Sequence, residues 1–90
     1  MAQIASQASH ITTNTTTTVV SDAAVLRTVT VNSAGASSNT ITIASGTFTI
    51  AVLDGTALQN NIYNIFCPEG ITVTTATGTA GDITVTYDKI

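Results

Sequence analysis

Apolar residues and threonines alternate with a period of two along most of the chain, and this pattern restricts the possible folds most strongly. Around residues 25–31, for example, Val25, Val29 and Val31 alternate with Leu26, Thr28 and Thr30. A β-strand points successive side chains to opposite faces, so this alternation predicts strands with one apolar face and one polar face. Threonine accounts for 20 of the 90 residues, and the β-branched shape of Thr and Val suits pleated sheets. We find no useful stretch with helical periodicity and expect an all-β protein.

Turn signals divide the alternating segments at spacings typical of a sandwich or a small barrel. Ser45-Gly46 and Asp54-Gly55 are favoured turn dipeptides. Pro68 presets φ, and Gly70 supplies a positive φ at the next turn. We therefore predict a small antiparallel β-sandwich, jelly-roll or Ig-like, of six to seven short strands over residues 23–90.

Residues 1–22 differ from the rest, because they contain no Gly or Pro and few large apolar residues. We predict that they form an extended N-terminal arm, in which Met1–His10 is flexible. Ile11–Val20 is expected to be extended and to add as an edge strand to its own sheet or to a neighbour's. The alternative for the first ten residues is terminal disorder.

The arm and one basic residue supply the candidate contacts with partner proteins. Arg27 shares a strand face with valines, so its stem is expected to pack on the sheet while its charged head reaches water. The alternative role for Arg27 is an ion pair between subunits. The complete set of candidate contacts is Ile4, Ile11, Thr16, Val19, Val20 and Arg27.

The most continuously apolar run, Ile62–Cys67, predicts a buried central strand. Cys67 is the single cysteine, so one chain holds no disulfide framework and no CxxC metal site. We interpret Cys67 as a small core residue; the alternative is a reactive or intermolecular thiol.

Charged residues make up 8% of the chain, and the net charge is −3. An ordinary domain carries about 25% charged residues, so this surface is compatible with one that neighbouring subunits cover. Arg27 and Lys89 are the only basic side chains, which leaves no electrostatic footprint for nucleic acid. No stretch approaches the ~20 apolar residues of a membrane span, and the first residues do not predict a Sec-type signal peptide.

The titratable residues do not form a recognisable catalytic or metal-binding motif. His10, the one histidine, falls in the predicted arm, whereas a catalytic base needs a fixed geometry. Asp22, Asp54 and Asp82 stand beside small or turn residues and are expected to form Asx-turns or caps. A calcium site would need Asp54 and Asp82 to converge from different loops. We expect no enzymatic activity, no cofactor and no metal.

Four segments together resemble small β-structured virion proteins of tailed bacteriophages. Their order and spacing carry the resemblance, which covers about two-thirds of the chain. The segments are VLRTVTVN at 25–32, NTITI at 39–43, FCPEGITV at 66–73 and GDITVTY at 81–87.

The resemblance implies a capsid decoration (cement) protein that binds the outer surface of the capsid shell and stabilises it. The implied partners are the major capsid protein and further copies of the chain, with a trimer favoured over a dimer. The implied location is the outer capsid surface, after synthesis in the host cytoplasm. The alternative is a phage tail or fibre component that binds a receptor or glycan through Thr56–Asn61 and Tyr63. A small hydrolase and a pilus-like subunit are further, less favoured alternatives.

Overall fold

The computed structural model describes residues 7–90, which form eight β-strands and no helix. The strands are β1 (Gln7–Ile11), β2 (Thr16–Val20), β3 (Ala24–Ser33), β4 (Thr40–Ser45), β5 (Phe48–Asp54), β6 (Gln59–Cys67), β7 (Ile71–Ala76) and β8 (Asp82–Lys89).

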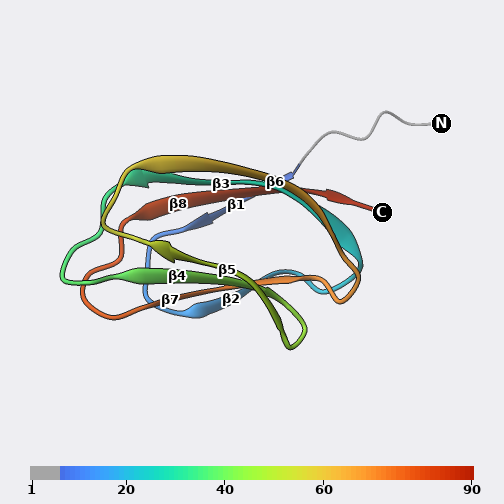
Figure 1. Cartoon of the computed structure of the whole chain (residues 1–90), viewed down its shortest axis with the longest axis horizontal. Coiled ribbons are helices and arrows are strands. Elements are labelled where there is room, and N and C mark those ends of the chain that lie inside the picture. Colours follow the sequence, from blue (N-terminus) through green and yellow to red (C-terminus); the bar gives the residue numbers. More distant parts are fainter. Residues whose placement is uncertain (1–6) are drawn as a thin grey trace.

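The strands form two four-stranded sheets that stack face to face (Figure 1). Sheet A has the order β1-β8-β3-β6 and sheet B the order β2-β7-β4-β5. Every pairing within them is antiparallel. The chain changes sheets at every connection except the β4–β5 hairpin. The antiparallel sandwich is therefore confirmed, and this eight-stranded double-sheet order is that of a jelly roll.

The core lies between the two sheets and is built from the apolar positions of the alternating pattern. Its largest fully buried side chains are Leu26, Ile41, Ile43, Ile71 and Ile83. The intervening threonines pair across strands on the outer faces, as Thr16 and Thr74 do at 3.0 Å between their hydroxyl oxygens. Burial of the aliphatic face is therefore the main force that holds the sheets together.

The turn prediction for Pro68–Gly70 is confirmed by the backbone. Gly70 has a φ of 85°, a conformation that residues with a side chain rarely adopt. Its backbone also lies against the carbonyl oxygen of Val20, so a Cβ at this position would clash with β2. The turn thus fixes the passage from β6 in sheet A to β7 in sheet B.

The described part of residues 1–22 is not a separate arm, although β2 confirms that part of Ile11–Val20 adds as an edge strand to the chain's own sheet. β1 pairs with β8 in sheet A, and β2 pairs with β7 in sheet B. The prediction of flexibility is therefore wrong for residues 7–10, and the sandwich includes residues 7–22 as well as 23–90. Ile11 and Val20 anchor these strands in the core, and burial of two large side chains offsets the weak apolar content of the segment. Met1–Ser6 lie outside the described residues.

The prediction that Ile62–Cys67 forms a central strand is also wrong. β6 is one of the two edge strands of sheet A, with β3 as its one neighbour in the sheet. Ile62 and Phe66 are exposed, whereas Cys67 at the end of the strand is buried, as predicted for a core residue. Residues 62–67 carry apolar side chains on both faces of β6, but only the face toward the core is covered.

Candidate interaction surface

Exposed large apolar side chains gather on one side of the sandwich. Of the six in residues 7–90, five belong to β5, to β6 or to the connection between them; the sixth is Ile90. We call this region, residues 48–67, the β5–β6 side. Its exposed apolar side chains, with their exposed fractions, are Phe48 (69%), Val52 (64%), Leu58 (67%), Ile62 (69%) and Phe66 (56%).

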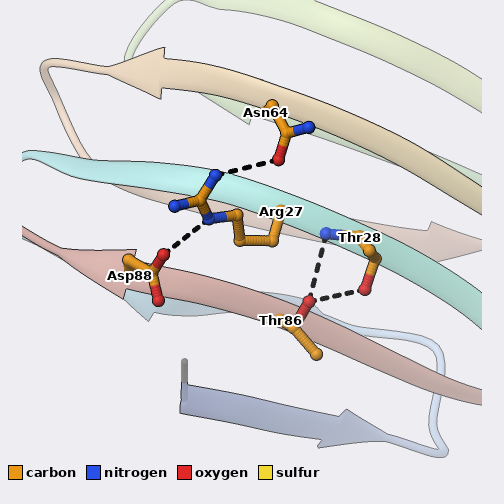
Figure 2. Close-up of polar contacts among 5 residues, drawn as sticks. All are labelled: Arg27, Thr28, Asn64, Thr86 and Asp88. Carbon is orange, nitrogen blue, oxygen red and sulfur yellow. Dashed lines mark hydrogen bonds and ion pairs between the residues drawn. The ribbon is translucent and has the colours of Figure 1, made fainter. Parts of the chain in front are cut away.

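These side chains surround the edge of the sandwich and do not lie in one plane. Val52 is opposite Thr42, so it projects from the outer face of sheet B. Ile62 is opposite Thr28, whose hydroxyl contacts that of Thr86 on the outer face of sheet A (Figure 2). A partner that covers the β5–β6 side therefore contacts both sheets.

The opposite side of the sandwich, between β1 and β2, is closed by the chain itself. Ile11 and Val20 are both buried there. Thr75 fixes the connection between the two strands. Its backbone nitrogen donates to the carbonyl oxygen of Thr15 at 2.9 Å, and its hydroxyl donates to the carbonyl oxygen of Thr13 at 2.5 Å. The two sides therefore differ in how well they shield the core.

On the β5–β6 side, four side chains that pack against the core are only half-buried. Burial raises the pKa of the Tyr63 phenol above its ordinary value, because a low-dielectric environment disfavours the phenolate. Tyr63 thus contributes to the partly covered core and is not a freely exposed aromatic ring. The four half-buried side chains are Ile50, Leu53, Tyr63 and Ile65.

A small pocket of about 150 Å³ opens between the two edge strands, where β5 begins and β6 ends. Phe48 and Phe66 form its exposed apolar walls, and Glu69 adds one acidic residue to its lining. The pocket can accept one side chain of a partner, since its volume is below that of typical small-molecule sites. Its lining is Ser45, Phe48, Ile50, Ile65, Phe66, Pro68 and Glu69.

Both edge strands on this side carry a β-bulge. In β5, Ile50 is the extra residue between the pairs Ile43–Ala51 and Ala44–Thr49. In β6, Tyr63 and Asn64 stand opposite Arg27, and Asn64 has a φ of 54°. Bulges interrupt the ladder and twist an edge away from further pairing.

Arg27 connects three strands across the outer face of sheet A (Figure 2). Its Nε donates to Asp88 Oδ2 at 2.5 Å, and its Nη1 donates to Asn64 Oδ1 at 3.0 Å. The guanidinium group therefore fixes the β6 bulge to β3 and pairs within its own chain. The side chain is partly exposed, which agrees with the interpretation that its stem packs on the sheet.

The other predicted contact residues are not brought together into one surface. Ile11 and Val20 are core residues, so their side chains are not available to a partner. Val19 is half-buried, while Thr16 is exposed on β2. Ile4 lies outside the described residues. Leu58 lies within Thr56–Asn61, the segment assigned to the tail or fibre alternative, but the other exposed side chains of the β5–β6 side were missed. The residues Asn60, Ile62 and Asn64 nevertheless indicate a strand face shared by polar and apolar side chains.

The carboxylates of Asp54, Asp82 and Asp88 make separate contacts in the described part of the chain and do not form a cluster. His10 Nε2 contacts Asp82 Oδ1 between β1 and β8, on an exposed surface. Thr56 donates to Asp54 Oδ1 from both its hydroxyl and its backbone nitrogen, and these bonds lower the pKa of Asp54. The backbone bond confirms the predicted Asx-turn at Asp54. Among residues 7–90, no three His, Cys, Asp or Glu side chains are grouped as metal ligands.

Comparison with models of protein families found no match, and neither did searches of curated proteins and of solved structures. Within residues 7–90, no helix has the length and apolar character needed to cross a membrane.

Proposed function

We propose that the protein is a structural virion protein, a capsid decoration (cement) protein that binds the outer surface of the shell and stabilises it. The observation that carries this proposal is the exposed apolar surface of the β5–β6 side. A soluble monomer rarely exposes large contiguous apolar patches, and larger ones mark sites of interaction.

The size of this surface suits protein contact. An aromatic side chain carries about 150–250 Å², so the exposed fractions of Phe48 and Phe66 correspond to roughly 250 Å². With Val52, Leu58 and Ile62 the total is on the order of 500 Å². A standard interface covers about 800 Å² on each partner, so these side chains would supply much of the apolar area for a partner that wraps the edge and contacts both sheets, because Val52 and Ile62 project from the outer faces of different sheets.

The shortage of charge supports the same role. Removing charges from water is costly unless they are paired, and 8% charged residues leave few such costs on binding. The fold adds an argument by analogy, since jelly rolls occur in viral capsid proteins and in lectins. The fold alone does not select between those two functions.

Cryo-electron microscopy of the virions that carry this protein tests the proposal. We expect density for the jelly roll on the outer capsid lattice, with the β5–β6 side against the shell. Particles assembled without the protein should release their DNA at a lower temperature. Density confined to the tail would refute the capsid role and support the tail or fibre alternative.

Substitutions at two exposed positions test whether the capsid contacts the β5–β6 side or β2, which carries predicted contact residues. Phe48→Lys places a charge on the β5–β6 side, and Thr16→Lys places the same charge on β2. We expect Phe48→Lys to reduce particle binding at least tenfold, which corresponds to about 1.4 kcal/mol. Thr16→Lys should bind like the wild type. The reverse result would assign the contact to β2.

One observation favours the alternative of a glycan-binding tail module. A shallow hollow with polar groups lies beside the β5–β6 connection, where this alternative places its binding loop. Asp54 and Thr56 line it together with backbone and side chains of the β3–β4 region. Binding to a glycan array that Asp54→Ala abolishes would support this function over the capsid role.

A further inference from the structure

We infer that β6 is a self-pairing edge, which joins the β6 strand of a second copy antiparallel about a two-fold axis at Asn60. This interface deepens the proposed assembly role, because it names one contact between copies. β6 forms a free edge of sheet A, because it has a neighbour on one side only within the described chain. Unpaired strand edges are templates for pairing with another chain.

The β6 bulge limits the part of the edge that can pair regularly. Tyr63 and Asn64 form the bulge, so the regular stretch runs from the start of the strand to Ile62. Exposed and half-buried side chains alternate along this stretch. Its midpoint, with the exposed Leu58 just before the strand included, is Asn60.

The segment Leu58–Ile62 reads the same in both directions when residues are grouped by chemistry. A two-fold axis at Asn60 places Leu58 opposite Ile62 of the second copy, and Ile62 opposite Leu58. The two large exposed side chains of each copy therefore cover one another, and the amide residues between them face amide residues. Isologous contacts require this self-complementarity.

Hydrogen bonding at the axis is also self-complementary. Asn60 Oδ1 accepts from the hydroxyl of Thr30 at 2.9 Å, which orients the side chain on the outer face. Its amide NH₂ has no partner among residues 7–90. Across the axis, each Asn60 amide can donate to the Oδ1 of the other copy, since a carbonyl oxygen accepts two bonds.

Charge distinguishes β6 from other free edges. β6 contains no Asp, Glu, Lys, Arg or His, whereas β5 ends at Asp54 and β1 contains His10. A self-paired strand places each charge near its own image, and like charges opposite one another destabilise a sheet. The uncharged β2 edge is bulged at Val19 and exposes no large apolar side chain.

The interface is short, so we expect a weak dimer with a dissociation constant in the micromolar range. An edge of five residues lies at the low end of specific interfaces. The two-fold pairing favours a dimer over the trimer expected from the resemblance. Repeated contacts on an ordered lattice would strengthen such a weak interaction through avidity.

Sedimentation of the isolated full-length protein, from low micromolar to millimolar concentration, tests the inference. We expect the wild type to convert from monomer to dimer. Asn60→Lys sets two ammonium groups against each other at the axis and should keep the protein monomeric, or weaken the dimer at least tenfold. The matched control Asn32→Lys, at an exposed asparagine of β3, should dimerise normally. A wild type that stays monomeric, or a dimer that survives Asn60→Lys, overturns the inference.

Cysteine cross-linking tests the register. Directly opposite Cβ atoms in an antiparallel pair lie about 4.5–5.5 Å apart, close to disulfide geometry. Asn60→Cys should therefore form a disulfide-linked dimer on oxidation. Ile62→Cys should not, because the two copies of residue 62 are offset by four residues, or about 13 Å. The wild type, with its buried Cys67, is the control. Cross-linking through Ile62→Cys alone would refute the assigned axis.

These measurements use the protein without capsids, so the two proposals can fail separately. A monomer that still decorates capsids would remove the β6 interface and leave the proposed function in place. A protein that dimerises but is absent from the capsid would keep the β6 interface and refute the proposed function.

Discussion

Asn39 connects three segments beneath one end of the sandwich, and Asn39→Asp tests whether this network stabilises the fold. The side chain is buried, and its Nδ2 lies 2.9 Å from Asn14 Oδ1, 3.2 Å from the carbonyl oxygen of Ala76 and 2.9 Å from that of Thr77. Aspartate has nearly the same shape, but it replaces the donor with an oxygen. Three acceptors would then face a carboxylate with no proton to share.

The expected cost at pH 7 is about 3–5 kcal/mol, because the variant buries an uncompensated charge. For a domain of this size, 1 kcal/mol corresponds to about 4–8 °C in Tm, so a 3 kcal/mol loss lowers Tm by about 12–24 °C. Burial and the facing oxygens raise the folded-state pKa of the new carboxyl group above its unfolded value of about 3.9. The variant should therefore regain stability as the pH falls through that raised pKa, because the neutral acid can donate one hydrogen bond.

Urea unfolding followed by circular dichroism, at pH 7 and at pH 3.5, measures both effects. Each variant is compared with the wild type at the same pH, which removes the pH dependence that the two proteins share. Asn32→Asp is the matched control, because Asn32 is exposed and donates to the hydroxyl of Thr84 at 2.8 Å. Its change should stay within about 0.5 kcal/mol. An Asn39→Asp variant as stable as the wild type at pH 7 would refute this account of the network.

Three further predictions concern the core, the first two strands and the cysteine. Leu26→Ala should lower the free energy of unfolding by about 2–5 kcal/mol in urea titrations, whereas Leu58→Ala, at an exposed position, should cost less than about 0.5 kcal/mol. Deleting residues 1–20 removes β1 and β2 and should abolish cooperative thermal unfolding; a retained transition would show that these strands are dispensable. Burial raises the pKa of the Cys67 thiol, so stability should fall as the pH rises above about 9, where the unfolded thiol ionises. The fall should be shallower in Cys67→Ala.

Local pattern predicted the strands from residue 23 onward, because the identity of a strand depends on alternation within a few residues. The position of each strand within a sheet depends on distant partners. Ile62–Cys67 appeared central because its residues are apolar, but β3 is its one neighbour in sheet A. The segment of residues 7–20 looked like an arm because Ile11 and Val20 stand in a polar context, yet each fills a place in the core.

The exposed apolar surface could not be predicted for the same reason, because it depends on which strands lie at the edges of the sheets. Ile62 and Phe66 lie on an edge strand, so a further strand beside β6 would cover part of their exposed area without changing the face to which they point. The sequence therefore contains the residues of the surface, while the jelly-roll order decides that they meet solvent. The residues Asn60, Ile62 and Asn64 indicate a strand face shared by polar and apolar side chains, but this local pattern does not show whether a neighbouring element covers that face.

The shortage of basic residues explains why the edges depend on backbone shape. Lysines commonly protect free edges, but Lys89 lies at the end of β8, and Arg27 pairs with Asp88 within the sheet. In their place, bulges interrupt β5 at Ile50 and β6 at Tyr63. A bulge shortens the regular edge without removing it, so β6 keeps one uncharged stretch. A regular edge of that length can pair with one antiparallel strand. In a two-fold dimer that strand is the same stretch of β6 in the second copy, so both free edges are covered by one contact. Pairing of this kind closes at the dimer, which explains how an edge with so little charge can avoid open-ended aggregation.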